Sequence, residues 1–139
     1  MAGSLIDELR VGTSQFLACG SSDNRYVAAF EDDGQTGYFY GCIATPNGPS
    51  KFQIIDALHI YNVASVTDKE RASTLEVSWA DNPPHRVGLF INGYCHAVYD
   101  FDLKRAGCRT GFPPADRRFT QSHAWDDSLM EGLIQRRPR

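Results

Sequence analysis

The chain has 139 residues, of which 42% are hydrophobic and 22% are charged, and its formal net charge is −3. This balance is that of an ordinary globular protein and excludes a disordered or fibrous chain. The length predicts one domain over residues 1–139. No apolar run reaches the roughly 20 residues that a membrane span needs, and the N-terminus lacks the pattern of a secretory signal. We therefore expect a cytoplasmic protein without a membrane partner.

Charge is unevenly distributed along the chain. Acidic residues outnumber basic ones up to residue 102, whereas basic residues outnumber acidic ones from residue 103 onward. The basic third, which contains Arg117 and Arg118, is compatible with packing across an acidic sheet or with anion binding. Nucleic-acid binding through it is a weaker hypothesis, because the whole chain is acidic and aromatic residues are sparse there.

The four cysteines are widely spaced and form no CxxC motif. This spacing fits neither a zinc ribbon nor a dense disulfide scaffold. We expect free thiols, with Cys42 and Cys95 acting as small buried hydrophobic residues, and we expect neither a metal nor a cofactor.

The first half of the chain reads mainly as strands. Residues 1–12 are ambiguous, because their helical spacing leaves room for only a turn or two, and a short strand is plausible at Thr13–Cys19. Residues 25–31 and 38–43 predict an antiparallel hairpin across a loop rich in Asp and Gly. Residues 51–63, rich in Ile and Tyr, predict a central strand.

Alternation continues in the next two strand candidates. Residues 74–80 predict a half-exposed strand with Leu75, Val77 and Trp79 facing inward. Asn92-Gly93 then joins two apolar runs and is the strongest signal for a hairpin in the chain. A two-residue turn there predicts three opposed pairs: Ile91 with Tyr94, Phe90 with Cys95, and Leu89 with His96. That register places His96, Val98 and Asp100 on the face of Leu89, and Ala97 and Tyr99 on the face of Phe90.

The end of the chain predicts a helix from about His123 to Gln135. Ser122 can cap it, acidic residues lie in its first turn and arginines in its last. Its apolar stripe should pack on a sheet. The predicted fold is therefore α+β: a curled, mainly antiparallel sheet of six or seven strands, with a C-terminal helix packed on one face.

Three residues are candidates for catalytic chemistry: Asp56, His59 and His96. If their strands are neighbours, these side chains could converge as a metal site or an acid–base pair. The alternative is that the histidines are structural, and no HxH or HExxH motif is present. Cys95 cannot act with His96, because adjacent strand residues point to opposite faces.

Asp56 is the most informative single candidate. A carboxylate on an apolar strand face needs a partner, because burial of an unpaired charge is very costly. Arg109 or another basic group of the C-terminal loop could supply that partner. As candidate ligand or anion contacts we select Asp100, Arg109, Arg117 and Arg118.

Four phrases carry a resemblance to a known family: FEDDGQTGYFYG at Phe30–Gly41, IIDALHIYNV at Ile54–Val63, INGYCHAVYDF at Ile91–Phe101 and CRTGFPP at Cys108–Pro114. Together they resemble domain of unknown function 2251, a family of small bacterial proteins. The resemblance covers about residues 11–125. It implies a stand-alone bacterial cytoplasmic protein with a β-rich fold, and it transfers no functional residue because the family has no established activity.

The leading functional hypothesis is a small non-catalytic module that binds a protein or a small ligand, in a regulatory or immunity-like role. It follows from the lack of a catalytic signature together with the segregated charge. The alternative is a hydrolase-type or metal-dependent enzyme that uses Asp56, His59 and His96. Strands that are apolar on both faces are also compatible with a homodimer.

Overall fold

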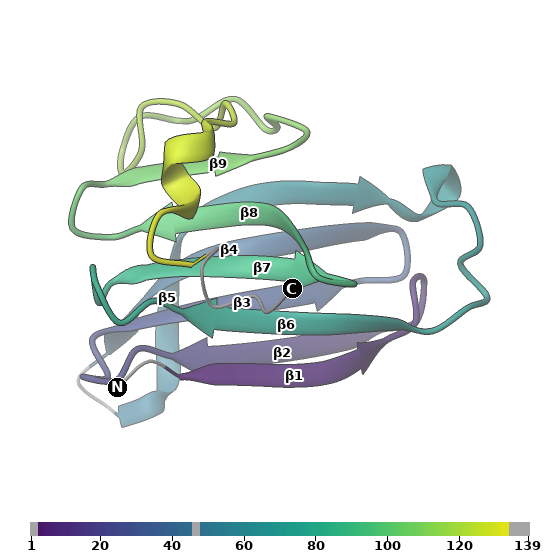
Figure 1. Ribbon diagram of the computed structural model, residues 1–139, viewed down its shortest axis with the longest axis horizontal. Coiled ribbons are helices and arrows are strands. Elements are labelled where there is room, and N and C mark those ends of the chain that lie inside the picture. Colours follow the sequence, from purple (N-terminus) through teal and green to yellow (C-terminus); the bar gives the residue numbers. More distant parts are fainter. Residues whose placement is uncertain (1–2, 46–47, 134–139) are drawn as a thin grey trace.

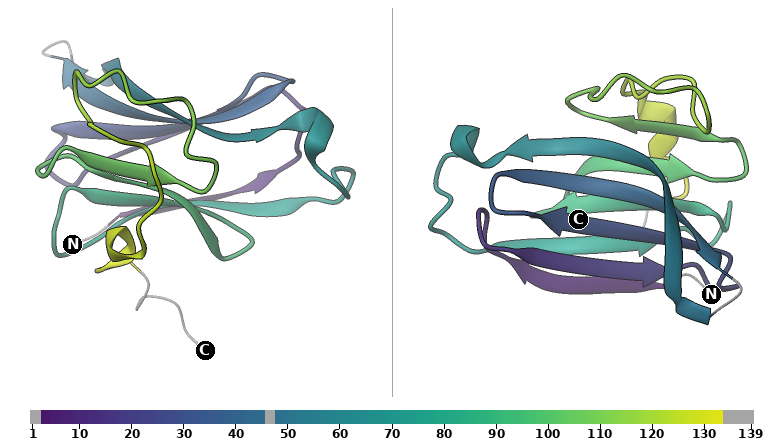
Figure 2. Two further views of the ribbon diagram at one scale, coloured as in Figure 1. Left: turned by 90° about the horizontal axis from the view of Figure 1, so that it is seen from above. Right: turned by 180° about the vertical axis from the view of Figure 1, so that it is seen from behind.

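The computed structural model describes residues 3–45 and 48–133, and it consists almost entirely of strands. Two antiparallel sheets pack face to face (Figures 1 and 2). One sheet has the order β1-β6-β7-β8-β9, with β1 (Ser4–Leu9), β6 (Ser73–Trp79), β7 (Arg86–Ile91), β8 (Tyr94–Asp100) and β9 (Arg105–Cys108). The other has the order β2-β3-β4-β5, with β2 (Gln15–Gly20), β3 (Tyr26–Asp32), β4 (Thr36–Thr45) and β5 (Gly48–Asn62). Two short 3-10 helices are also present. The first, η1 (Val63–Ser65), follows β5, and the second, η2 (Asp127–Met130), comes after β9.

The predicted α+β fold is wrong. The described ranges hold two sheets instead of one curled sheet, and they contain no α-helix. The reason lies in the strands themselves, since apolar residues on both faces need a layer on each side. A second sheet covers one face of the five-stranded sheet, and residues of the C-terminal segment cover part of the other. No helix among the described residues is long and apolar enough to cross a membrane.

The predicted C-terminal helix over His123–Gln135 is also wrong. The start of this segment is not helical: its main chain lies beside β9, where the N–H of Cys108 donates to the carbonyl of His123 at 3.2 Å. Only one 3-10 turn follows. Gly132 then takes a φ of +84°, and a Cβ there would lie 2.6 Å from the Asn82 carbonyl oxygen, so the chain leaves helical geometry. Gln135 lies outside the described residues.

The apolar side chains of that segment still cover part of the five-stranded sheet. Leu129 and Leu133 are buried on its outer face against Phe90, Cys95 and Val98. The amphipathic pattern therefore predicts correctly that these apolar side chains are buried, but it does not predict the backbone conformation.

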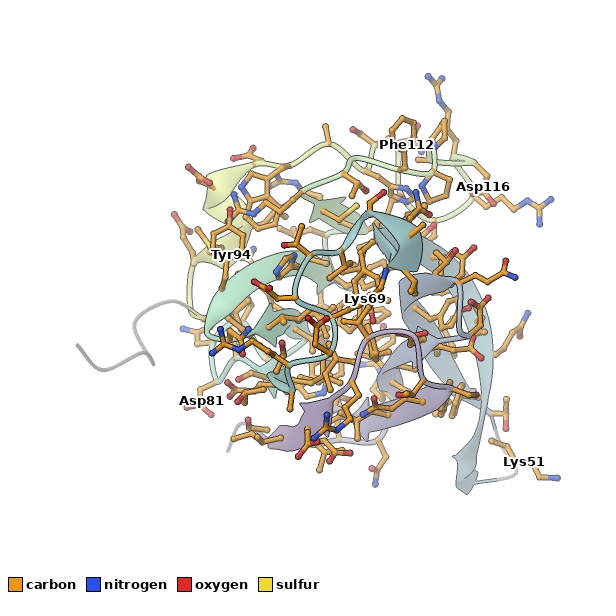
Figure 3. The ribbon with its side chains drawn as sticks, turned by 90° about the vertical axis from the view of Figure 1, so that its right-hand side faces the viewer. Lys51, Lys69, Asp81, Tyr94, Phe112 and Asp116 are labelled. Atoms are coloured by element: carbon orange, nitrogen blue, oxygen red, sulfur yellow. The ribbon has the colours of Figure 1, made fainter. Side chains whose placement is uncertain are left out.

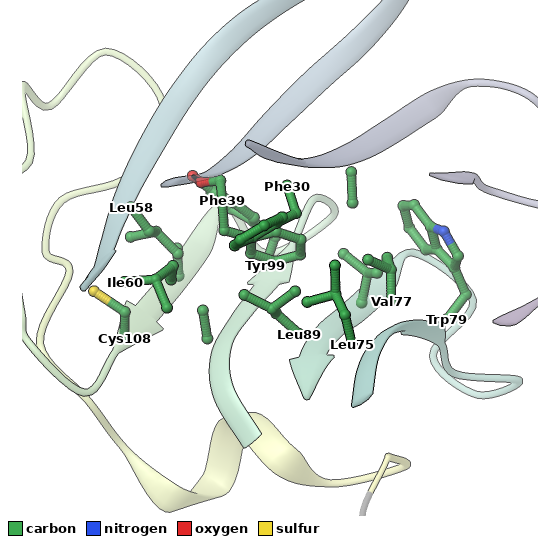
Figure 4. Packing of buried hydrophobic residues seen from close by; sticks show 14 of the residues in the cluster. Phe30, Phe39, Leu58, Ile60, Leu75, Val77, Trp79, Leu89, Tyr99 and Cys108 are labelled. Atoms are coloured by element: carbon green, nitrogen blue, oxygen red, sulfur yellow. Dashed lines mark hydrogen bonds between the residues drawn. The ribbon is translucent and has the colours of Figure 1, made fainter. Parts of the chain in front are cut away.

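The main core lies between the two sheets (Figure 4). Leu75, Val77 and Trp79 of β6 face into it, as their alternation predicted. The indole N–H of Trp79 also donates to the carbonyl of Cys19 at 3.2 Å, which ties the two sheets together. The largest fully buried side chains include Trp79, Tyr99, Phe30, Phe39, Phe90, Leu58 and Leu89.

The Asn92-Gly93 hairpin is confirmed at its turn and wrong beyond it. Ile91 pairs with Tyr94 and Phe90 with Cys95, as expected. Leu89 instead pairs with Ala97, so His96 is the extra residue of a β-bulge. The bulge moves Ala97 and Tyr99 into the core beside Leu89 and leaves Val98 on the outer face.

The hairpin of residues 25–31 and 38–43 is confirmed by the pairing of β3 with β4. Of the strand predicted over residues 51–63, residues 51–62 lie in β5 and Val63 begins η1. The strand lies at the edge of its sheet and not at the centre, where it was predicted. The first part of β5 turns across the ends of the neighbouring strands (Figure 2), and Phe52 stacks on Phe16 of β2 at 6.3 Å. Because β5 is the last strand of its sheet, the edge that faces away from β4 has no neighbouring strand among the described residues.

Candidate functional site

An open cleft of about 560 Å³ lies where β5 meets the loop that runs from Pro113 to Phe119. The loop follows β9 and forms one wall, while β5 forms the other. The lining residues are mostly apolar, with a few polar side chains among them: Ile43, Gln53, Ile54, Ile55, Asp56, Ala57, Pro113, Pro114, Asp116, Arg118, Phe119 and His123. Such a mixture of apolar walls and few polar groups is typical of ligand sites.

Asp56 lies at the base of this cleft. Its partner across the sheet is Gly41, which leaves room for the ring of Tyr99, since a Cβ at residue 41 would lie 3.1 Å from that ring. The Asp56 Oδ2 accepts from His123 Nε2 at 2.8 Å and from the hydroxyl of Thr120 at 3.2 Å. The side chains of Asp56 and His123 are only 4% and 2% exposed. The buried pair therefore fastens the loop wall to the sheet.

Both ring nitrogens of His123 face oxygen atoms. Nδ1 lies 2.5 Å from the carbonyl oxygen of Pro113, which can only accept, and Nε2 faces the Asp56 carboxylate. Burial alone would lower the pKa of His123, but the hydrogen bonds to Asp56 and Pro113 outweigh it and raise that pKa. The imidazolium form satisfies both contacts. Neither nitrogen is left to take a proton from a bound molecule.

The second oxygen of Asp56 is different. Oδ1 makes no hydrogen bond within residues 3–45 and 48–133, and Asp56 lines the cleft although the residue is only 8% exposed. Among the described residues, Ser78 Oγ is the one fully buried side-chain oxygen or nitrogen without a partner, so Oδ1 of Asp56 is open to the cleft. This atom is thus an acceptor available to a bound group at the base of the cleft.

The main chain of β5 also offers unpaired groups to the cleft. The N–H of His59 points away from β4 and donates to the carbonyl of Phe112 at 2.7 Å, and the His59 carbonyl accepts from the Thr110 hydroxyl at 2.6 Å. Because an antiparallel ladder alternates, the N–H and C=O of Ala57, two residues earlier, point to the same edge. Ala57 lines the cleft, and among the described residues nothing bonds to this edge of it.

The loop explains why this edge stays open. Thr110 and Phe112 bridge to His59 like the start of an additional strand. Pro113 and Pro114 follow directly, and proline has no N–H with which to continue a ladder. The bridge therefore ends beside Ala57 and leaves its edge exposed to the cleft.

The structure does not bring the three catalytic candidates together. Asp56 lies inside the sandwich, whereas His59 is on the outer face of β5, where it contacts the Tyr38 ring and Asn62. His96 is the bulge residue of the other sheet and contacts Tyr94. Within the described ranges, no group of three or more His, Cys, Asp or Glu side chains is placed to hold a metal ion.

The remaining candidates lie in different surroundings. Asp100 is buried in an ion pair with Arg86 at 2.9 Å, so it has a structural partner. Arg118 stands at the rim of the cleft, largely exposed, 3.9 Å from Asp116. Arg117 is exposed next to it.

Arg109 does not reach Asp56 and lies instead near His96, where its N–H donates to the His96 carbonyl. The basic group of the C-terminal segment that does neutralise Asp56 is His123. Sequence reasoning missed this residue, together with Thr120, because His123 was placed in a helix. The signal that could have found it was the requirement of buried Asp56 for a cation from that same segment.

Cys42 is not placed as a nucleophile. It is fully buried, and burial raises its pKa to about 12, so the thiol stays protonated near neutral pH.

Comparison with known proteins gives two matches. A family model described as an uncharacterised protein conserved in bacteria (DUF2251) matches residues 9–134. An uncharacterised protein of Haemophilus influenzae strain Rd is 42% identical over 99 residues, which are 70% of this chain. The match covers 59% of that relative's own length. No solved structure matches the chain.

Proposed function

The chain belongs to this bacterial family of uncharacterised proteins, and we propose that it is a non-catalytic module that binds an extended segment of another protein. The segment lies in the cleft beside β5 and adds to that strand as a further strand. The observation that carries this proposal is the outward N–H and C=O of Ala57 in an open, mainly apolar cleft. Addition of a strand to an exposed sheet edge is a recurrent mode of peptide recognition.

The cleft supplies specificity as well as main-chain hydrogen bonds. Alternate side chains of an added strand point to opposite sides. Ile54 is 49% exposed on the β5 side, and Phe119 stands in the loop wall, so both can contact apolar side chains of the segment. The free Oδ1 of Asp56 favours a segment that brings a hydrogen-bond donor to the base of the cleft.

A binding role fits the side-chain chemistry better than catalysis. His123 has no free ring nitrogen, and the three catalytic candidates of the enzyme hypothesis lie in separate parts of the fold. The regulatory or immunity-type role stays part of the proposal, because either acts through protein binding. We also place the module in the bacterial cytoplasm, which is supported by four free cysteines, Cys19, Cys42, Cys95 and Cys108.

The test starts from a displayed library of random peptides about ten residues long, the length of a generous strand. The binding of the best peptide is then measured with the Ala57→Pro variant, which loses the outward N–H but no hydrogen bond to β4. Proline is tolerated at such edge positions. We expect affinity to fall at least about fivefold, the equivalent of one hydrogen bond.

Ala18→Pro is the matched control. Ala18 lies in β2 at the opposite edge of the same sheet, and its N–H points away from β3 by the same alternation. Binding should be unchanged in that variant.

A second arm uses the unaltered chain and the same peptide N-methylated at alternate amides. Methylation of the amides that face β5 should abolish binding, and methylation of the amides between them, which face away from β5, should preserve it. Equal binding of the two methylated peptides, or a binder that tolerates Ala57→Pro and not Ala18→Pro, would overturn the proposal.

A further inference from the structure

Arg109 is held in place by four contacts on the outer side of the five-stranded sheet. Its main-chain N–H donates to the carbonyl of His96 at 3.1 Å, and its Nε donates to the carbonyl of Cys95 at 3.0 Å. The guanidinium carbon lies 3.8 Å from the centre of the Trp125 ring and 4.6 Å from that of Tyr94. Contact with two aromatic rings is a favourable setting for a cation. The side chain is therefore fixed although it reaches the surface.

This arrangement leaves the end of the guanidinium unused. Arginine has five N–H donors, and in Arg109 only the one on Nε has an acceptor among the described residues. Arg86 shows the contrast, since its Nη atoms bond to Asp100 and to main-chain carbonyls. Arg105 and Arg118 each have a carboxylate nearby, whereas Arg109 makes no ion pair within residues 3–45 and 48–133.

The geometry of the free Nη donors of Arg109 indicates which ligand they would bind. Paired Nη donors match the two oxygens of a carboxylate. An arginine that is already immobilised loses little side-chain entropy when it binds. We propose that Arg109 forms a carboxylate-binding site for an acidic group of a protein partner.

The surroundings of Arg109 fit contact with a protein. Tyr94, Trp125 and arginine are residue types that dominate the binding energy of interfaces, and Tyr94 is 53% exposed. Burial and the charge of Arg109 lower the pKa of His96, so this neighbour is neutral near pH 7 and does not compete for the anion. Asp127 accepts from the Trp125 indole at 2.7 Å and makes no ion pair with Arg109.

The site is separate from the cleft beside β5. None of the residues that hold Arg109 lines that cleft. Figure 3 shows Tyr94 on one side of the molecule and Asp116, at the cleft rim, on the other. A failure of the carboxylate site would therefore not affect the proposed function, and a failure of the proposed function would not affect the carboxylate site.

The test is a titration of the full chain with sodium acetate, followed by nuclear magnetic resonance at constant ionic strength set with sodium chloride. We expect saturable shifts of the Trp125 indole N–H and of the His96 ring, and a rise in the pKa of His96 as the bound anion offsets Arg109. Arg109→Gln should weaken acetate binding about tenfold or more. Arg25→Gln is the matched control, because Arg25 also lies over an aromatic ring, that of Tyr26, at 5.5 Å.

If the glutamine variant does not fold, Arg109→Lys replaces it. It should also weaken acetate binding, because an ammonium group cannot form the paired bonds. Shifts that chloride reproduces, or that persist in both Arg109 variants, would overturn the proposal. Tighter binding of inorganic phosphate than of acetate would overturn the assignment to carboxylates.

Discussion

Replacement of His123 by alanine is the perturbation whose cost follows most directly from the structure. The variant leaves Asp56 almost fully buried, with Thr120 as the one remaining donor to its Oδ2. Removal of one member of a buried ion pair costs about 3–5 kcal/mol. For a chain of this length that loss corresponds to a fall in melting temperature of about 10 °C or more. His123→Ala should therefore be among the most destabilising single substitutions in the loop wall.

The same pair predicts a pH dependence with a definite sign. The folded-state pKa of His123 is raised above its ordinary value of 6.5, despite burial, by the contacts to Asp56 and Pro113 and by the charge of Asp116. Its stabilisation is therefore fully present below about pH 6.5 and is lost as pH rises through the folded-state pKa. The difference in unfolding free energy between the unaltered chain and His123→Ala should be larger at about pH 6 than at about pH 9.

Urea denaturation at both pH values measures this difference. His85 is present in both proteins, so its own titration cancels. The double variant Asp56→Asn/His123→Ala should lose less than the two single variants added together, since the unpaired charge is gone. A loss below about 1 kcal/mol for His123→Ala, typical of a surface substitution, or a difference that does not change with pH, would refute the reasoning.

Three further predictions concern contacts away from the cleft. Arg86→Met should cost about 3–5 kcal/mol and speed amide exchange in the C-terminal segment, because Arg86 also donates to the carbonyls of Ser128 and Glu131. Gly132→Ala should cost about 1–3 kcal/mol in a denaturation experiment, because its φ of +84° is strained for other residues. The pKa of His85 is lowered by burial but raised overall by two carboxylates that bond its ring, so that stabilisation is present below about pH 6.5 and lost above the raised pKa. His85→Gln should flatten this part of the stability profile.

The predictable part of the fold was local. The Asn92-Gly93 turn and the first two cross-strand pairs follow from turn chemistry, and β6 follows from clean alternation. The bulge at His96 has no comparable signal in the sequence, and one extra residue exchanges the faces of all that follow. The same limit applies to the segment after Ser122, where bonds from distant β9 override an amphipathic pattern.

The predictable part of the site was the need of Asp56 for a partner. Strand alternation placed this carboxylate on an apolar face, and burial of a charge demands compensation. The identity of the partner depends on how the chain after β9 returns to β5, and that path is set by tertiary contacts. His123 and the open edge at Ala57 therefore emerge only from the folded arrangement.

The measurement that tests the central claim most directly is amide hydrogen exchange at Ala57 with and without a saturating selected peptide. A strand added to β5 would bond the outward N–H of Ala57 and slow its exchange, while the N–H of Ala18 at the opposite edge would exchange as before. Slower exchange at Ala57 alone is the result that the account predicts. Unchanged exchange at Ala57 while the peptide is bound would contradict it.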